Sequence, residues 1–293
     1  MTAAPVRREA FAAAKVNLFL HVGPKAADGY HPIASLFVFA DVGDRLLLDE
    51  GAARGLSIDG PFGTGLSTGP DNLVLRARDA LSPDLAVRLK LEKALPLAAG
   101  LGGGSADAAA TLRLLNPLLP RPRAPGEIVA IAAALGADVA ACLESRAVMA
   151  MGRGDELSPA PTLPVLPAVL VNPGVESPTG AVYRAFDETA SAPSADRPAM
   201  AAALATPREV ADLVARTRND LEAPAVDLSP AIGEALAALH GAPEALVARM
   251  SGSGATCFAL CETMAEAGAL AERLAAAHPR WWVRACRLGG PWT

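Results

Sequence analysis

Residues 95–116 read LPLAAGLGGGSADAAATLRLLN, in which four glycines and a serine come directly before an alanine-rich amphipathic run. The run predicts an α-helix over residues 105–115, which Asn116 and Pro117 end. The start of an α-helix carries unpaired backbone amides and a partial positive charge, so it attracts an anion. This stretch therefore predicts an anion site at the start of a helix.

The glycines suit a loop that cradles phosphate, because they lack the Cβ atoms that would block a close approach and they allow positive φ angles. They are Gly100, Gly102, Gly103 and Gly104. Ser105 is expected to cap the helix or to offer its hydroxyl to a phosphate or a metal ion. The alternative is a glycine-rich turn that only lets a strand pass close to a helix.

Two well-known phosphate motifs do not fit the loop. A Walker A loop ends in Gly-Lys-Ser/Thr, whereas here Gly104 is followed by Ser105 and Ala106. The dinucleotide fingerprint needs glycine or alanine at its sixth position, and counting from Gly100 places Ser105 there. The loop is therefore of another kind.

Length and composition limit the classes of protein. A chain of 293 residues exceeds the usual size of one domain, and the pattern of elements restarts past residue 150, so we predict domains at 1–155 and 156–293. Aromatic residues make up only 4%, so the core is expected to consist of Ala, Val and Leu. The formal net charge of −5 gives no overall positive field for a nucleic acid, but it does not exclude a small anionic ligand, because local groups can hold one.

The cysteines and the N-terminus point to a cytoplasmic protein. Cys142, Cys257, Cys261 and Cys286 lie in apolar runs without CxxC spacing, so we expect them to be reduced core residues. The apolar stretch within residues 1–22 is interrupted by polar residues and is too short to span a bilayer, so no membrane association is expected.

Hydrophobic periodicity predicts an α+β fold. Strands are expected at residues 11–21, 44–50, 87–93, 166–174, 245–250, 255–261 and 281–288. Helices are expected at residues 72–81, 105–115, 126–135, 231–240 and 263–277, with another that begins at residue 137. Residues 187–207 are rich in Ala, Ser and Pro and are typical of a mobile surface connection.

A lysine in the first apolar strand suggests catalytic chemistry. Lys15 is one of only four lysines, and without a partner a charged side chain there would be costly, so it requires a carboxylate or a phosphate. Asp138, in the stretch GADVAACL, is the expected carboxylate and could accept a proton from an attacking hydroxyl group. The structural alternatives are a snorkelling or salt-bridged lysine and an aspartate that caps a helix.

Five motifs in this order resemble those of the GHMP kinase superfamily. They are AKVNLFL (14–20), DGYH (28–31), PLAAGLGGGSADAA (96–109), GADV (136–139) and MSGSGATCFA (250–259). The resemblance implies a two-domain α+β fold, with an N-terminal domain like domain 2 of ribosomal protein S5 and a ferredoxin-like C-terminal domain. It also implies an active site in the cleft between them.

Within the superfamily, the first two motifs resemble the branch that transfers the γ-phosphoryl group of ATP to the 2-hydroxyl of 4-diphosphocytidyl-2-C-methyl-D-erythritol, on the non-mevalonate route to isoprenoids. The resemblance implies ATP with Mg²⁺, Asp138 as the base, Lys15 as its electrostatic partner, and Asn17 as a residue that orients the substrate. The alternatives are another GHMP-type kinase, a catalytically silent nucleotide-binding protein, and a dinucleotide-dependent oxidoreductase.

The resemblance also implies binding residues. For ATP these are Asn72, Lys93, Pro96, Gly100, Leu101, Gly102, Gly103, Gly104 and Ser105, with Ser105 also a candidate metal ligand. For the substrate they are Asn17, Tyr30, His31, Asp138, Thr179 and Tyr183, with the two tyrosines on the faces of cytosine and His31 at its edge. Structural alternatives are a loop pair for Tyr30 and His31, a helix cap for Asn72, and a solvated strand end for Lys93.

The chain departs from the family pattern near two of these motifs. Ala140 stands where the family usually has proline, so we expect a looser backbone after Asp138. Leu97, Ala98 and Ala99 stand where glycine is frequent, so a stiffer start of the glycine loop is expected. Neither departure removes a proposed catalytic group.

Overall fold

The structure is a computed structural model. It describes residues 8–49, 54–189 and 194–293. Glu50, at the end of one predicted strand, and residues 190–193 of the predicted connection lie outside the described residues. Within the described ranges, no helix is both long and apolar enough to cross a membrane.

Strands and helices are interspersed along the described chain. The strands are β1 (Glu9–Val22), β2 (Ile33–Asp49), β3 (Gly55–Asp59), β4 (Arg88–Glu92), β5 (Val148–Met151), β6 (Glu156–Pro159), β7 (Leu166–Asn172), β8 (Val247–Met250), β9 (Cys257–Leu260) and β10 (Trp282–Gly289). The α-helices are α1 (Leu73–Leu81), α2 (Gly103–Leu115), α3 (Pro125–Leu135), α4 (Ala137–Glu144), α5 (Thr179–Asp187), α6 (Pro207–Arg216), α7 (Glu222–Leu228), α8 (Pro230–His240) and α9 (Met264–Ala277).

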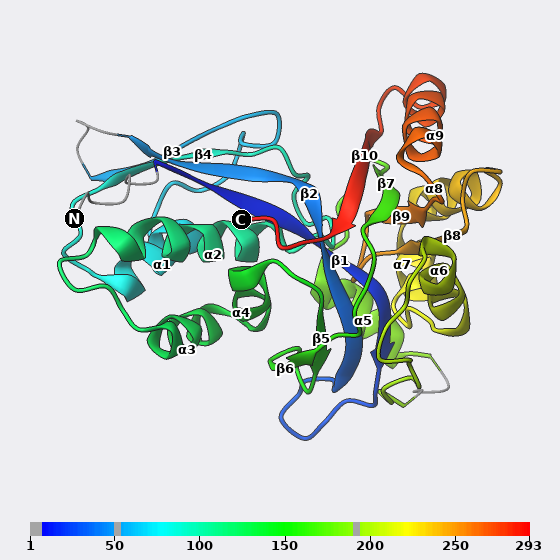
Figure 1. The fold of residues 1–293 in the computed structure, drawn as a ribbon, viewed down its shortest axis with the longest axis horizontal. Helices are drawn as coiled ribbons and strands as arrows, with labels where there is room; N and C mark the ends of the chain where they lie inside the picture. The colour runs from blue at the N-terminus through cyan, green and yellow to red at the C-terminus, as the bar shows by residue number, and fades with distance from the viewer. Residues whose placement is uncertain (1–7, 50–53, 190–193) are drawn as a thin grey trace.

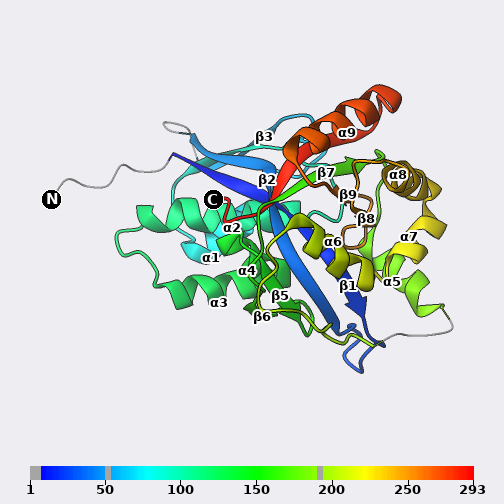
Figure 2. The same ribbon diagram turned by 45° about the vertical axis from the view of Figure 1, so that its right-hand side comes forward.

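A mixed sheet links the two ends of the molecule. Its order is β3-β4-β2-β10-β7-β9-β8, with β1 and β5 also paired to β2 and with β6 paired to β5. The long strands β1 and β2 run through the whole molecule, with α1–α4 near one end and α6–α9 near the other (Figure 1). The turned view in Figure 2 shows the same separation of the helices. The predicted α+β class is confirmed.

Strand β1 carries polar residues within an apolar sequence. Its pairing register with β2 shifts between Ala13 and Lys15 and again between Asn17 and Phe19. Such bulges redirect side chains. Lys15 and Asn17 face the same cavity, whereas Phe19 is fully buried in the core.

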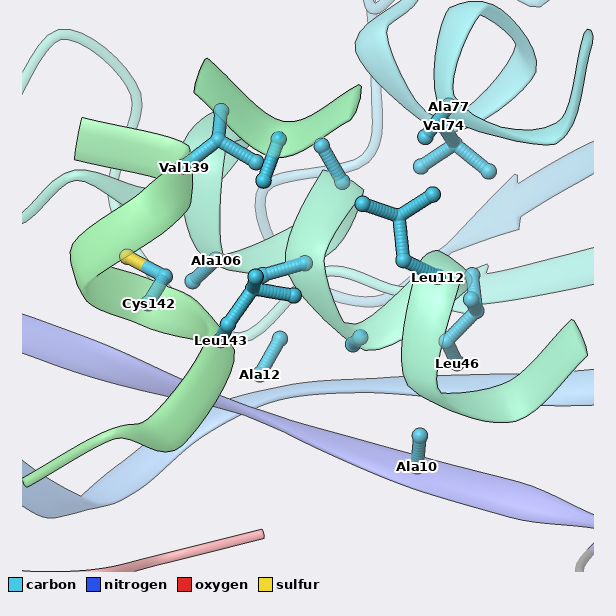
Figure 3. Packing of buried hydrophobic residues seen from close by; sticks show 14 of the residues in the cluster. Ala10, Ala12, Leu46, Val74, Ala77, Ala106, Leu112, Val139, Cys142 and Leu143 are labelled. Atoms are coloured by element: carbon cyan, nitrogen blue, oxygen red, sulfur yellow. The ribbon is translucent and has the colours of Figure 1, made fainter. Parts of the chain in front are cut away.

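Small and branched aliphatic side chains fill the core, as the composition predicts. On α4, Val139, Cys142 and Leu143 pack against Ala106 and Leu112 of α2 (Figure 3). Alanines on α2 and β1 let the helix lie close to the strand, because their side chains end at Cβ. All four cysteines are free and buried, as expected, and burial raises the pKa of the Cys142 thiol to about 12.

The first turn of α2 corrects one prediction. The helix begins at Gly103, two residues earlier than expected, and its N-cap is Gly102 with a left-handed φ of 62°. Ser105 therefore lies inside the first turn, and the expectation that its side chain caps the helix is wrong. The backbone of a glycine, which adopts positive φ without a steric penalty, starts this helix instead.

Several elements were not predicted. They are the first part of β2, the strands β3, β5 and β6, and the helices α5, α6 and α7. The N-cap of helix α6 is Thr206, whose side chain accepts a hydrogen bond from the amide of Glu209, but the helix follows a stretch whose composition resembles a linker. The part of that linker after residue 193 is held by hydrogen bonds. The backbone amide of Thr162 donates to the carbonyl of Ala202, and Nδ1 of His21 donates to the carbonyl of Asp196.

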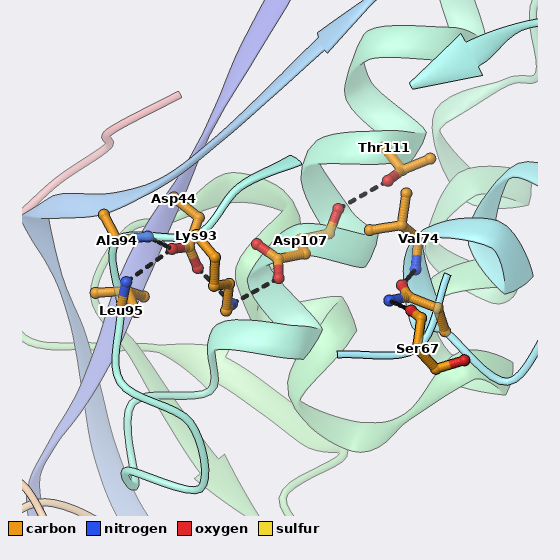
Figure 4. Close-up of polar contacts among 9 residues, drawn as sticks. Asp44, Ser67, Val74, Lys93, Ala94, Leu95, Asp107 and Thr111 are labelled. Carbon is orange, nitrogen blue, oxygen red and sulfur yellow. Dashed lines mark hydrogen bonds and ion pairs between the residues drawn. The ribbon is translucent and has the colours of Figure 1, made fainter. Parts of the chain in front are cut away.

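A buried ionic cluster joins β2, the end of β4 and α2 (Figure 4). The ammonium of Lys93 lies 2.5 Å from Asp44 Oδ2 and 2.7 Å from Asp107 Oδ2, and all three residues are buried. The other oxygen of Asp44 accepts hydrogen bonds from the amides of Ala94 and Leu95. Asp44 therefore fixes the chain that leads into the glycine loop.

One ammonium between two carboxylates leaves excess negative charge in the cluster. Burial raises the pKa of Asp107 to about 7, and the charge of Asp44 adds to this rise while Lys93 opposes it. Burial alone would lower the pKa of Lys93, but the two carboxylates raise it above its usual value. Lys93 is thus a structural cation that remains charged.

We expect Asp44→Ala to lower the free energy of unfolding by about 3–5 kcal/mol, because it removes a partner of a buried ion pair and the acceptor of two amides. Urea denaturation measures this. The matched control is Asp49→Ala on the same strand, whose carboxylate forms an exposed pair with Arg88 and should cost under about 1 kcal/mol. Equal effects of the two substitutions would contradict the assignment.

Candidate active site

One cavity of 590 Å³ collects most of the predicted site residues. Those that line it are Lys15, Asn17, Asn72, Lys93, Pro96, Gly100, Leu101, Gly102, Gly103, Gly104, Ser105, Asp138, Thr179 and Tyr183. Tyr30 and His31 do not line it, although each contacts a residue that does. Residues from distant parts of the sequence are thus brought to one site, and their individual roles stay predictions.

The glycine loop forms the start of α2 in this cavity. Gly100 and Gly102 have left-handed φ angles of 71° and 62°. A Cβ atom on Gly102 would lie 3.3 Å from the side chain of Lys15, and a Cβ atom on Gly103 would lie 3.0 Å from the ammonium of Lys93. Glycines suit Gly102 and Gly103 because the side chains of two lysines lie directly against these positions. Its free amides make the start of α2 suitable for an anion.

The turn between β8 and β9 holds the loop from the other side. The hydroxyl of Ser251 donates to the carbonyl of Gly100 at 3.0 Å and accepts from the amide of Asn17 at 3.1 Å. The amide of Thr256 donates to the carbonyl of Ala99. A Cβ atom on Gly100 would collide with the carbonyl of Ser251. One buried serine therefore links β1 to the glycine loop.

Lys15 and Asp138 form the ion pair that the sequence analysis anticipated. Lys15 Nζ lies 2.9 Å from Asp138 Oδ2 and 4.0 Å from the centre of the Phe37 ring. Lys15 is only 6% exposed, so the snorkelling alternative is wrong. Gly136 is the N-cap of α4, so Asp138 is not the helix cap. A partly exposed carboxylate held by a buried ammonium is suited to accept a proton.

Asn17 offers a free acceptor beside this pair. Its side-chain amide donates to Ser35 Oγ at 2.8 Å, which fixes its orientation. Its Oδ1 atom is buried and has no hydrogen-bond partner among the described residues. Asn17 lines the cavity, and a buried acceptor normally has a partner, so this oxygen is a candidate contact for a ligand group that donates a hydrogen bond.

Aromatic residues gather at the end of the cavity formed by α5. The rings of His31 and Tyr183 lie 5.0 Å apart, and Phe186 meets His31 edge-on at 5.8 Å. Burial raises the pKa of Tyr183 to about 12, and the charge of Asp138 adds to the rise. Tyr30 is 58% exposed at the rim. Tyr183 lines the cavity, so this end presents a flat aromatic surface, and the His31 ring packs beside it.

An aspartate orients His31. Asp187 Oδ1 accepts a hydrogen bond from His31 Nε2 at 2.6 Å, and Lys25 lies 3.5 Å from the other oxygen. Burial alone would raise the pKa of Asp187, but its contacts with His31 and Lys25 lower it. Asp187 was not among the predicted site residues, because it lies 156 positions from His31 and no local pattern marks the pair.

The remaining candidates differ in how they are held. Asn72 caps α1 by accepting a hydrogen bond from the amide of Val74, so the helix-cap alternative holds; it also lines the cavity, and its contact with ATP stays a prediction. Lys93 is 3% exposed, so the alternative of a solvated strand end is wrong. The hydroxyls of Thr179 and Ser253 form a hydrogen bond at 3.0 Å, which links the start of α5 to the turn after β8.

A metal ion would have few protein ligands here. Among the described residues, no group of three or more His, Cys, Asp or Glu side chains is arranged to hold one. The cavity does present oxygen donors in Asp138 and Ser105, and no described residue hydrogen-bonds the Ser105 hydroxyl. These donors suit a hard cation that keeps most of its ligands from water or a bound phosphate.

The sequence matches known kinases over nearly its whole length. The GHMP kinases N terminal domain model matches residues 72–146, and the GHMP kinases C terminal model matches residues 200–280. The 4-diphosphocytidyl-2-C-methyl-D-erythritol kinase of Caulobacter vibrioides (strain NA1000 / CB15N) is 57% identical over 97% of this chain and 100% of that protein. The protein of the same name in Dinoroseobacter shibae is 51% identical over 93% of this chain and 92% of that protein.

Solved structures agree with these matches. A crystal structure of 4-(cytidine 5'-diphospho)-2C-methyl-D-erythritol kinase has a TM-score of 0.76 at 36% sequence identity and covers 97% of this chain and 100% of that chain. A homoserine kinase from Cytophaga hutchinsonii has a TM-score of 0.66 at 19% identity, covers 99% of this chain and 96% of that chain, and shares the fold. The expected GHMP kinase fold is confirmed. The chain therefore belongs to the 4-diphosphocytidyl-2-C-methyl-D-erythritol kinase family of the GHMP kinases.

Proposed function

We propose that this kinase transfers the γ-phosphoryl group of ATP to the 2-hydroxyl group of 4-diphosphocytidyl-2-C-methyl-D-erythritol. The observation that carries the proposal is the Lys15–Asp138 pair, at 2.9 Å, in the same cavity as the bare start of α2. A phosphate site and a candidate base thus share one space. The names of the relatives supply the acceptor.

The phosphates of ATP bind to the loop from Gly100 to Ser105. The unpaired amides at the start of α2 donate to the phosphate oxygens, and the partial positive charge of the helix adds attraction. The adenine lies toward Asn72 and Pro96, which line the same cavity. Lys93 supports the site by packing against Gly103. Its ammonium is already held by the carboxylates of Asp44 and Asp107.

The acceptor binds at the opposite end. Cytosine stacks against Tyr183 and Tyr30, and His31 contacts the edge of the base. The free Oδ1 of Asn17 accepts a hydrogen bond from an acceptor hydroxyl. Thr179, at the start of α5, contacts the substrate between these groups. Burial of the base between aromatic rings provides affinity without requiring charge.

Asp138 accepts the proton of the 2-hydroxyl group as its oxygen bonds to the γ-phosphorus. The bond from that phosphorus to the β–γ bridging oxygen breaks, and ADP leaves. Lys15 holds the Asp138 carboxylate in position through their ion pair. Phosphoryl transfer depends mainly on positioning and charge stabilisation, so these residues and the amides of the loop suffice for the protein's part.

ATP is expected to bind with Mg²⁺, which neutralises phosphate charge. The Ser105 hydroxyl is the oxygen donor that would hold the ion beside the phosphates, with its other ligands from the phosphates and from water. We also propose the division into domains 1–155 and 156–293. The two family matches, at residues 72–146 and 200–280, lie on either side of this position and support it.

The proposed acceptor can be tested directly. Purified protein with ATP and Mg²⁺ should release ADP with 4-diphosphocytidyl-2-C-methyl-D-erythritol at a kcat/KM at least about 100-fold above that with mevalonate, homoserine or galactose, because those acceptors lack a base to stack. A coupled ADP assay measures all four. A faster reaction with one of the other three acceptors would reject the proposed substrate, and no ADP release would reject the kinase assignment.

Asp138→Asn should lower kcat by about 10²- to 10⁴-fold, because the amide cannot accept the proton that a carboxylate accepts. KM for ATP should change less than threefold, since the glycine loop is intact. Glu144→Gln is the matched control, because it lies on the same helix with an exposed partner, Arg146. Near-normal turnover of Asp138→Asn would exclude this residue as the base.

Tyr183→Ala should raise KM for the cytidyl acceptor by about tenfold or more, because base–aromatic stacking is worth about 1–3 kcal/mol. Tyr183→Phe keeps the ring and should stay within about threefold of the wild type. Initial rates at saturating ATP measure both. If the phenylalanine variant lost as much as the alanine variant, the hydroxyl rather than the ring would carry the contact.

A further inference from the structure

The positive charges that line the cavity are not equally available. Of the lining residues, Lys15, Lys93 and Arg153 are cationic. Asp138 neutralises Lys15, and Asp44 with Asp107 neutralise Lys93. Arg153 is the remaining lining cation. Its ion-pair partner among the described residues is Asp155, which lies 3.5 Å away and does not line the cavity.

The turn between β5 and β6 directs Arg153 toward the reaction site. Gly152 and Gly154 flank it with left-handed φ angles of 64° and 92°, which make the turn tight. The carbonyl of Gly152 accepts a hydrogen bond from the amide of Ile33 at 2.7 Å. A Cβ atom on Gly154 would lie 3.9 Å from Cβ of Ala137, the neighbour of Asp138. The turn therefore packs against the start of α4.

Arg153 also contacts the aromatic end of the site. Its guanidinium lies over the ring of Tyr30, 5.1 Å from the ring centre, in a cation–π arrangement. The guanidinium side chain is 55% exposed, so it can be reached by a ligand. Arg153 thus connects the tyrosine at the rim with the helix that carries the candidate base.

A nucleoside diphosphate ester has its parts in the same order, with the base at one end, the diphosphate in the middle and the alcohol at the other end. Resting on the proposed function, we propose that Arg153 binds the diphosphate group of the acceptor. A guanidinium suits this group because its planar donors can bind two phosphate oxygens at once. The start of α2 is then left free for the phosphates of ATP.

Steady-state kinetics test the assignment. Arg153→Gln should raise KM for 4-diphosphocytidyl-2-C-methyl-D-erythritol about tenfold and leave KM for ATP within about twofold. The acceptor KM of Arg153→Lys should lie between those of the wild type and Arg153→Gln, because lysine keeps the positive charge but lacks the planar set of guanidinium donors. Arg146→Gln is the matched control, since Arg146 is also exposed and paired with a carboxylate two positions away, but it lies outside the cavity. An unchanged acceptor KM, or an equal rise in KM for ATP, would overturn the assignment.

Calorimetric titration with CDP and with cytidine separates the diphosphate from the base. Arg153→Gln should weaken CDP binding about tenfold and leave cytidine binding within twofold. Equal weakening of both ligands would mean that Arg153 acts only through Tyr30, and would overturn the proposal. If the wild type binds CDP in this way but does not phosphorylate the cytidyl acceptor, the proposed function fails while the role of Arg153 stands.

Discussion

Two buried ammonium groups lie against the first residues of α2, and the rest of the site depends on how their charge is balanced. Lys15 lies against Gly102 and Lys93 against Gly103, where any side chain on the loop would crowd them. The start of a helix is itself positive, so two uncompensated lysines would repel it. Asp138, Asp44 and Asp107 provide the compensation. The glycine loop can therefore hold an anion without an excess of buried positive charge.

The two lysines have different tasks because their partners differ in exposure. Lys93 is enclosed by two buried carboxylates, so it ties strands to the helix and contributes position. Asp138, the partner of Lys15, is 35% exposed and faces the cavity. A proton can reach that carboxylate, and the ion pair with the buried ammonium fixes its position. Burial thus distinguishes a structural ion pair from one that can take part in chemistry.

The sequence predicted those features that are local or chemically costly. A lysine in an apolar strand required a carboxylate or a phosphate, and Lys15 does pair with the carboxylate of Asp138. The helix after the glycine loop followed from its periodicity, although its first turn did not, because Gly102 rather than Ser105 starts it. Asp44, Asp107 and Asp187 had no local signature. Their partners are fixed by strand pairing and by helix packing across the molecule, which a single sequence does not encode in any short pattern.

The start of the glycine loop illustrates how such long-range contacts act. Ala98 has a left-handed φ of 47°, a conformation that costs a residue with a Cβ atom about 1–2 kcal/mol. Glycine would adopt it without that cost, and it is frequent here in the family that the sequence resembles. The carbonyl of Ala98 accepts from the amide of Ser177, and the carbonyl of Ala99 accepts from that of Thr256. Hydrogen bonds from the C-terminal part of the chain therefore stabilise the loop in a shape that its own residues disfavour.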